Sequence, residues 1–439
     1  MPTGSSTPGA TRRGTSSTRA TTRCGTLLSD ARSIGRVALP LYLSMVAVSL
    51  GALVNTAALG RYGTEALAAF AVTTAVYFPA TAAVAGAVRG VMPFVAAKAD
   101  DPPELLRVVR NGTWLAVFVG VPAALAVAGA GVIARAGGVP AATVAQLGPF
   151  PLLMSAAMLI GGFGSMATSC LVGLGRSKVV MRAGLAGAAS TAVLSPLLVW
   201  KLGLNGAGIA LCTANLVSCL ITVSGLRGRL PGRLGRTIHF GQIRELAKVG
   251  IPMAGTVLVK FAVLGVLTVA AARVSTTAVA AHNIAAGLAG LTFTAAVAIG
   301  QAVVPLVSTR TEGVRRAVIA GLTITMVTLA AICAVVVLGG AERLFTDDPE
   351  VRAAVAGLLA LLVVVVLADG LQAVLGFGLA GLKRTTPSFV IFLGCYGVLA
   401  VIAVPAAQHG LTGLWAALAA ANLAVAVGQG FAFRRASNL

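Results

Sequence analysis

One motif of this sequence occurs twice: GLNGAGIALCTANL (203–216) returns 207 residues later as GLTGLWAALAAANL (410–423). A shift of 208 residues superposes a second pair, LVGLGR (171–176) and LAGLKR (379–384). Both pairs keep the same order along the chain, so the sequence indicates two related halves. We therefore expect each half to contain the same set of structural elements in the same order.

The composition indicates that these elements are surrounded by lipid rather than by water. The 439 residues have a mean hydropathy of +0.94, and only 10% are charged, whereas ordinary soluble domains carry roughly 25% charged residues. The apolar runs lack the alternation of a membrane β-barrel, and 53 glycines suit closely packed membrane helices. A helix needs roughly 20 apolar residues to cross the hydrocarbon layer. The sequence therefore predicts an all-α integral membrane protein embedded in the lipid bilayer.

The apolar runs predict twelve transmembrane helices, six in each half. Their expected ranges are 37–60, 65–97, 112–135, 147–174, 179–201, 206–226, 247–272, 277–308, 317–340, 353–382, 387–407 and 411–433. The two six-helix bundles, 35–226 and 247–433, should be related by an axis along the membrane normal and should surround a central cavity. Two such bundles can rock about the cavity, which is the architecture of alternating access.

The charges predict the orientation. With the amino terminus inside, cytoplasmic segments hold 25 of the 33 Lys and Arg residues, and the outer loops hold six. Positive loops stay in the cytoplasm, so both termini, the basic linker 227–246 and the tail 434–439 should be cytoplasmic, in a protein of the cell membrane. We therefore attribute the net charge of +21 to loops that set the membrane orientation and not to nucleic-acid binding. Residues 1–34 should form a disordered cytoplasmic tail, although an organellar transit peptide has a similar composition.

Several stretches resemble one transporter family in order and spacing. They are NTAALGRYGTEALAAF (55–70), GIP (250–252), AAHNI (280–284), IGQAVVPLVS (299–308) and DGLQAVLGFGLAGLKR (369–384). Together they are similar to the MATE (multidrug and toxic compound extrusion) family over residues 35–433. This resemblance implies a two-lobed exporter of organic compounds, driven by a proton or sodium gradient.

We accordingly expect an antiporter for a small organic cargo, coupled to protons rather than sodium and functional as a monomer. The resemblance leaves one alternative, a lipid-linked saccharide flippase of the same superfamily, which would call for a more basic cavity. No acid cluster, HExxH motif or activated nucleophile occurs at membrane depth in the sequence, so we predict neither an enzyme nor a bound cofactor or metal. The six cysteines show no metal-binding spacing.

Ionisable residues inside the membrane are costly and therefore informative. Asp369 is the only acid well within a predicted helix, and Gln372 follows one turn later on nearly the same face. Lys260 is the other deeply placed charge. The resemblance implies that Asp369 belongs to a cation and proton site, where one branch of the family carries Glu at the Lys260 position. We hypothesise that Lys260 and Asp369 pair across the second lobe, either as a proton-coupled switch or as a static salt bridge.

The first lobe lacks such an acid. The resemblance implies acids or amides at positions that are Asn55, Thr191 and Ser195 in this chain. Coupling through this lobe is thus not expected, and these side chains should at most donate hydrogen bonds to cargo. Arg89 and Gln301 occupy equivalent repeat positions, and Arg89 should extend its charge to the cytoplasmic surface. His282 is expected to form a hydrogen bond near the start of its helix and not to bind a metal.

Overall fold

The structure is a computed structural model. It describes the backbone of residues 15–438 except 233, 234, 236, 311, 341, 342 and 344, and it describes side chains from residue 27 onward. The described residues form helices and connecting turns without a β-strand. Twelve of the helical segments are long and apolar enough to cross a membrane, which confirms the predicted fold class.

The helices follow one another with short connections. Their bounds are α1 Thr15–Tyr62, α2 Thr64–Arg89, α3 Met92–Ala97, α4 Pro102–Ala128, α5 Ala130–Ala136, α6 Ala141–Ala145, α7 Phe150–Gly173, α8 Ser177–Leu202, α9 Leu204–Arg227, α10 Phe240–Val274, α11 Thr276–Ser308, α12 Val314–Leu338, α13 Pro349–Gly381, α14 Thr385–Ala407 and α15 Gly410–Ala436. All twelve predicted helices are present, with α2 and α3 together forming the second span.

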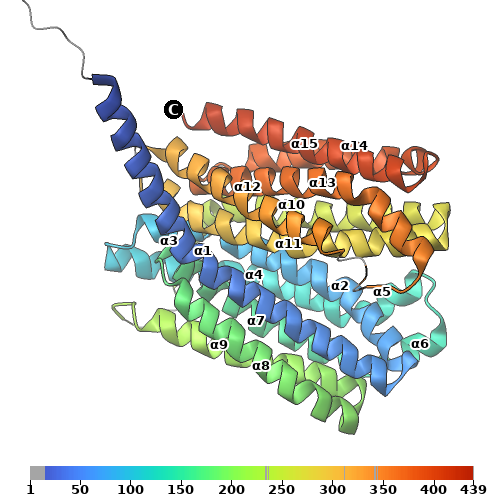
Figure 1. The fold of residues 1–439 in the computed structure, drawn as a ribbon. Helices are drawn as coiled ribbons and strands as arrows, with labels where there is room; N and C mark the ends of the chain where they lie inside the picture. Colours follow the sequence, from blue (N-terminus) through green and yellow to red (C-terminus); the bar gives the residue numbers. More distant parts are fainter. Residues whose placement is uncertain are drawn as a thin grey trace, which may run out of the picture.

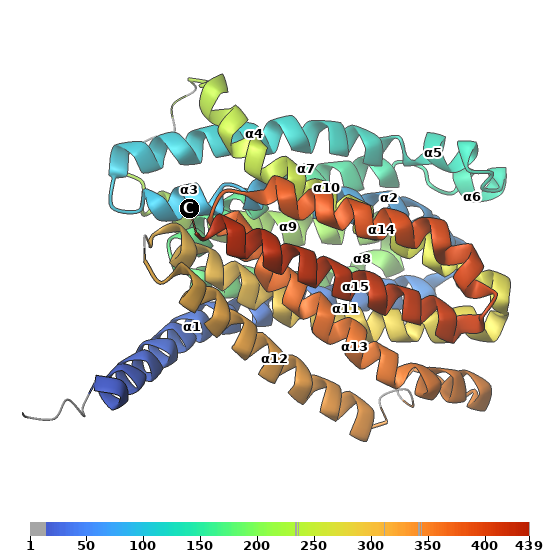
Figure 2. The same ribbon diagram turned by 90° about the horizontal axis from the view of Figure 1, so that it is seen from above.

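The two halves of the chain form two bundles that lie side by side (Figure 1). In the first half, α8 packs on α1 and α9, and α9 packs on α7. In the second half, α13 packs on α11 and α15, and α14 packs on α10 and α15. Seen from above, α4 and α12, the third spanning helix of each half, lie at opposite edges of the molecule (Figure 2). This arrangement agrees with the duplication that the repeated motifs predicted.

Besides α1, two helices begin seven or more residues earlier than predicted. The third span starts at Pro102 and not at 112, because Asp101 caps it by accepting a hydrogen bond from the Glu104 amide at 3.3 Å and Pro102 suits the first helical position. Helix α10 starts at Phe240, so Arg244 belongs to the helix and not to the linker. Both extensions are polar helical turns, which an apolar count cannot detect.

The predicted tail is partly helical. Helix α1 extends back to Thr15, into the segment 1–34 that the sequence predicts to be disordered. Residues 1–14 of that segment lie outside the described residues. No proline lies between Thr15 and Leu39 to interrupt an extension of the apolar helix toward the amino terminus.

The two bundles touch most closely between α2 and α10. A methyl group added at Gly90 would lie 2.5 Å from the Gly250 Cα atom, and one added at Gly250 would lie 2.0 Å from the Ala87 carbonyl oxygen. The two backbones are thus in direct contact, which only glycine permits. This contact closes the space between the bundles at the end of α2.

A buried ion cluster joins the bundles near the chain termini. Asp30 of α1 has a side chain that is 3% exposed, and its carboxylate accepts hydrogen bonds from Arg310 at 2.7 and 3.0 Å and from Arg316 at 3.1 Å. The hydrogen bond to Asp30 raises the pKa of the Arg310 guanidinium. The cluster therefore links the first helix of one half to the α11–α12 connection and the start of α12 in the other half.

Replacing Gly250 by alanine should destabilise the protein by about 1–3 kcal/mol, because the added methyl group overlaps the α2 backbone. Gly265→Ala, on the same helix and with open space around its Cα, is the matched control and should be neutral or stabilising by about 0.5–1 kcal/mol. Thermal unfolding of the two variants in detergent compares them. Equal melting temperatures would contradict the close contact.

Candidate functional site

A cavity of about 470 Å³ lies mainly within the second bundle. Helices α10, α11, α13, α14 and α15 supply most of its lining, and the first half contributes Met45, Ala82, Gly86 and Arg89. Aromatic rings form much of its wall, among them Phe261, Phe293, Phe392 and Trp415. Its size and its apolar wall with a few polar groups are typical of small-molecule sites.

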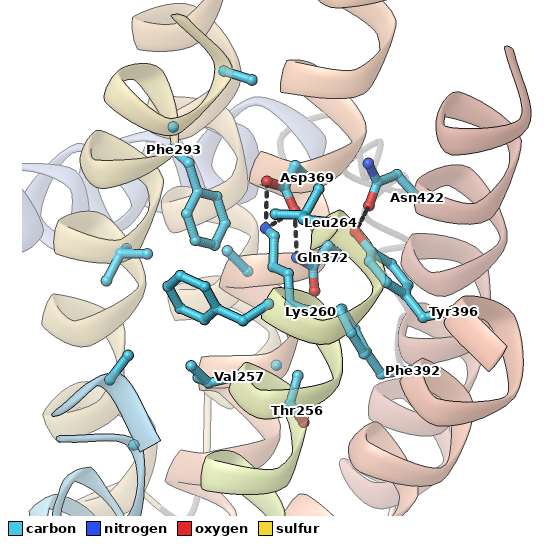
Figure 3. A pocket seen from close by; sticks show the side chains of 18 of the residues that line it. Thr256, Val257, Lys260, Leu264, Phe293, Asp369, Gln372, Phe392, Tyr396 and Asn422 are labelled. Atoms are coloured by element: carbon cyan, nitrogen blue, oxygen red, sulfur yellow. Dashed lines mark hydrogen bonds and ion pairs between the residues drawn. The ribbon is translucent and has the colours of Figure 1, made fainter. Parts of the chain in front are cut away.

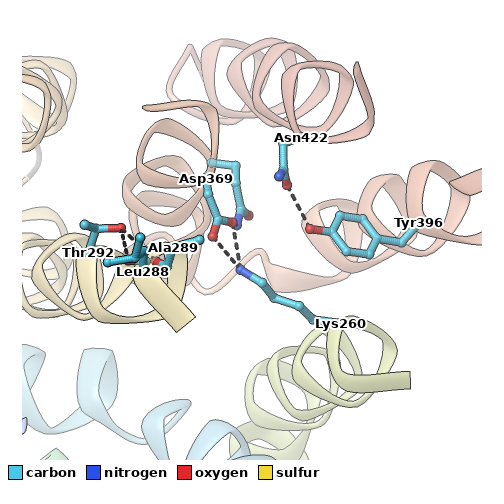
Figure 4. Close-up of polar contacts among 8 residues, drawn as sticks. Lys260, Leu288, Ala289, Thr292, Asp369, Tyr396 and Asn422 are labelled. Atoms are coloured by element: carbon cyan, nitrogen blue, oxygen red, sulfur yellow. Dashed lines mark hydrogen bonds and ion pairs between the residues drawn. The ribbon is translucent and has the colours of Figure 1, made fainter. Parts of the chain in front are cut away.

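Three of the predicted site residues meet in this cavity. The Lys260 amine donates to both carboxylate oxygens of Asp369, each at 2.7 Å, and Gln372 Nε2 donates to Asp369 Oδ1 at 2.7 Å. Figures 3 and 4 show the amine pointing directly at the carboxylate. The hypothesis that Lys260 and Asp369 pair across the second lobe therefore agrees with the geometry.

The pair joins helices that have different main packing partners. Lys260 lies on α10, which packs mainly on α14 and α2, whereas Asp369 lies on α13, which packs mainly on α11 and α15. The side chains are 20% and 9% exposed, so the ions are largely withdrawn from solvent. Desolvated ions of opposite sign attract strongly, and this contact therefore holds two walls of the cavity together.

An aromatic ring completes the environment of the amine. Lys260 Nζ lies 3.7 Å from the centroid of the Phe293 ring, as Figure 3 shows. A cation over a ring face gains electrostatic stabilisation, and more when it is desolvated. The lysine is thus held by a carboxylate and by a ring from α11.

Sequence reasoning missed two polar pairs in the lining. The Tyr396 hydroxyl donates to Asn422 Oδ1 at 2.8 Å, and Gln429 Nε2 donates to Ser388 Oγ at 2.9 Å. The repeat carried a signal for the first pair, because Asn422 corresponds to Asn215 in the motif that recurs at 207 residues. Asn215 also contacts a tyrosine, donating to the Tyr77 hydroxyl at 3.4 Å.

His282 lines the cavity, about two turns into α11. Its Nε2 atom lies 3.3 Å from Thr268 Oγ1, its ring meets that of Trp415 edge to face, and it is 2% exposed. The expected hydrogen bond is therefore present. Within the described part of the chain, no group of three or more His, Cys, Asp or Glu side chains could hold a metal ion.

The predicted first-lobe residues lie away from the cavity. Ser195 donates to Asn55, which joins α8 to α1, and Thr191 donates to the Gly187 carbonyl of its own helix at 3.2 Å. All three are buried, and none lines the cavity. Each of the three thus makes a hydrogen bond within the first bundle.

The equivalent residues Arg89 and Gln301 have different environments. Gln301 is buried and donates to the Val297 carbonyl of its own helix at 3.4 Å. Arg89 lines the cavity and is partly exposed, and the extension of its charge to the cytoplasmic surface stays a prediction. Arg89 ends α2 next to the contact of Gly90 with Gly250.

A duplicated set of twelve candidate membrane spans around an amphipathic cavity is the architecture of a multi-pass membrane transporter. The MatE family model matches residues 40–197 and 252–405. The chain therefore belongs to the MatE family. The two matched segments begin 212 residues apart, so they coincide with the two halves of the internal repeat.

Relatives and solved structures agree with this assignment. The chain is 28% identical to a probable multidrug resistance protein NorM of Bradyrhizobium diazoefficiens, over 87% of this chain and 88% of the relative. It is 27% identical to a NorM of Aromatoleum aromaticum, over 79% and 80%. A MOP superfamily transporter from Pyrococcus furiosus has the same fold, with a TM-score of 0.83, 19% identity, and 93% and 96% coverage. A crystal structure of MATE in the straight conformation gives a TM-score of 0.85 at 20% identity and the same coverage.

Proposed function

We propose that this protein exports organic compounds across the cytoplasmic membrane by alternating access, in exchange for protons. The observation that carries the proposal is the Lys260–Asp369 ion pair, which spans the cavity between α10 and α13. The names of the NorM relatives, which describe multidrug resistance, support an efflux function.

The contacts between the bundles support alternating access. The bundles are joined by the Gly90–Gly250 contact and by the Asp30 ion cluster. The start of α1 and the chain's carboxyl end lie at the same end of the molecule (Figure 1). With the positive residues of the loops on the inner side, both termini are cytoplasmic, and the bundles close on that side. Movement of one bundle against the other would then open the cavity to the cytoplasm.

The ion pair supports coupling to protons rather than to sodium. Both oxygens of Asp369 already accept hydrogen bonds from the Lys260 amine, so a sodium ion would have to displace a tethered cation. A proton that adds to one carboxylate oxygen instead forms an O–H bond and removes the negative charge. The attraction between α10 and α13 is then lost, and the equilibrium between two cavity shapes can shift.

We also propose that the protein functions as a monomer, because the cavity and the ion pair lie among the helices of one chain. We propose that cargo and proton share this cavity, so that binding of one changes the affinity for the other.

Efflux from proteoliposomes tests the function. The full chain is reconstituted in sodium-free liposomes, a pH gradient is imposed, and export of neutral, anionic and cationic fluorescent compounds is followed. We expect export of at least one compound to depend on the pH gradient and to stop when a protonophore collapses it. Export that ignores the pH gradient but requires sodium would overturn proton coupling, and absence of any export would overturn the efflux function.

The first-lobe polar residues are proposed to stabilise packing and not to couple transport. Replacing Ser195 by alanine removes the donor to the buried Asn55 oxygen, which should cost about 1–3 kcal/mol. Proton-driven export should remain. Ser190→Ala is the matched control, because Ser190 donates only to its own helix, to the Ala186 carbonyl. Loss of pH dependence in the Ser195 variant, with folding intact, would contradict this role.

A further inference from the structure

The charges that line the cavity do not balance. Its charged side chains are Arg89, Lys260 and Asp369, and the last two neutralise each other at 2.7 Å. The ion pairs of the described residues do not include Arg89, and neither do their side-chain hydrogen bonds. With His282 neutral, the cavity thus carries one uncompensated positive charge.

An arginine in such a place needs a partner. A guanidinium loses hydration next to apolar walls, and the loss is recovered when an anion accepts its hydrogen bonds. Its planar fork matches the oxygens of a carboxylate, sulfonate or phosphate in pairs. Arg89 lies at the end of α2, beside the closed contact of Gly90 with Gly250, so an anion bound there would lie at the closed end of the cavity.

The rest of the lining specifies the other part of the ligand. Phe261, Phe293, Phe392 and Trp415 present aromatic surface. Gln429 Oε1 and His282 Nδ1 are buried without a hydrogen-bond partner, and both residues line the same cavity. An aromatic or apolar body with a few polar substituents would contact these groups.

We infer that the cargo is an amphipathic organic anion, whose acidic group binds Arg89 while its apolar body packs on the aromatic wall. This inference rests on the proposed function, because it names the cargo of the same cavity. A cationic cargo would bring a second positive charge close to an unpaired arginine, which is unfavourable in a medium of low dielectric constant.

Three probes on one scaffold test the inference: 2-naphthalenesulfonate, 2-naphthalenemethanol and (2-naphthylmethyl)trimethylammonium. Their charges do not change with pH. Binding to the full chain in nanodiscs, corrected with empty nanodiscs, should follow the order sulfonate, alcohol, ammonium. Arg89→Gln should weaken sulfonate binding about 10- to 100-fold, as expected for the loss of a charged hydrogen bond, and should change alcohol binding less than about twofold. Arg89→Lys, which keeps the charge, should retain part of the sulfonate preference.

Arg61→Gln is the matched control, since Arg61 is exposed at the end of α1 outside the cavity lining, and it should leave all three affinities unchanged. The inference is overturned if the wild type binds the ammonium probe as tightly as the sulfonate, or if Arg89→Gln weakens all three probes equally. Because these are binding measurements, they separate the two claims. Tight sulfonate binding without export would contradict the proposed function alone, and export without a preference for anions would contradict this inference alone.

Discussion

Proton-driven export should fall to the background of protein-free liposomes when Asp369 is replaced by asparagine. The amide cannot take up and release a proton at the carboxylate position. It also leaves the Lys260 amine without the two charged hydrogen bonds that it makes at 2.7 Å. The cavity would then remain in one electrostatic state at every pH, and the pH gradient could no longer drive the bundles. The measurement is the initial rate of export in sodium-free proteoliposomes at a fixed pH gradient.

Asp347→Asn is the control for that experiment. Asp347 is an exposed acid in the turn that precedes α13, outside the cavity lining, so its replacement should leave the rate unchanged. If Asp369→Asn folds and still exports cargo in proportion to the pH gradient, then Asp369 is not the coupling group.

The second large effect concerns the exchange of the two charges. Lys260→Asp alone brings two carboxylates together, and Asp369→Lys alone brings two amines together. Each single variant should lose about 2–4 kcal/mol of stability through repulsion and uncompensated burial, and each should lose export. The double variant restores opposite charges on α10 and α13, so we expect both stability and a large part of pH-driven export to return.

The double variant also separates a switch from a static salt bridge. Thermal unfolding and export are measured on the same preparations, with Lys260→Met as a variant that removes the charge without adding another. A static bridge would be indicated if single variants that fold still couple export to the pH gradient. Failure of the double variant to regain either property would contradict direct pairing.

Much of the fold could be predicted, because the apolar runs indicate the spanning helices and the repeat indicates the two related halves. A lipid-exposed helix must be apolar over its whole span. A shift of 212 residues superposes Pro40 on Pro252, and the two MatE matches begin with the same spacing. The pairing of Lys260 with Asp369 could be predicted for an energetic reason, since isolated charges at membrane depth are costly.

Other features depended on which face of a helix points inward. Helix α13 is rich in Val, Leu and Ala on every side, so its pattern does not identify the face that lines a cavity. Arg89 lines the cavity beside the close approach of α2 and α10 at Gly90 and Gly250, and no single helix encodes that contact. The burial of Asn55 against Ser195 likewise depends on the packing of α1 on α8.

The most direct test of proton antiport uses the efflux of cargo to drive protons into the liposomes. Wild-type proteoliposomes are loaded with a permanently charged cargo at equal pH inside and outside, without sodium and with the membrane potential clamped at zero. Internal pH is followed with a trapped dye. If cargo leaves in exchange for protons that enter through Asp369, the interior should acidify as cargo leaves, and Asp369→Asn should abolish the acidification. Cargo efflux with no change of internal pH would contradict the account.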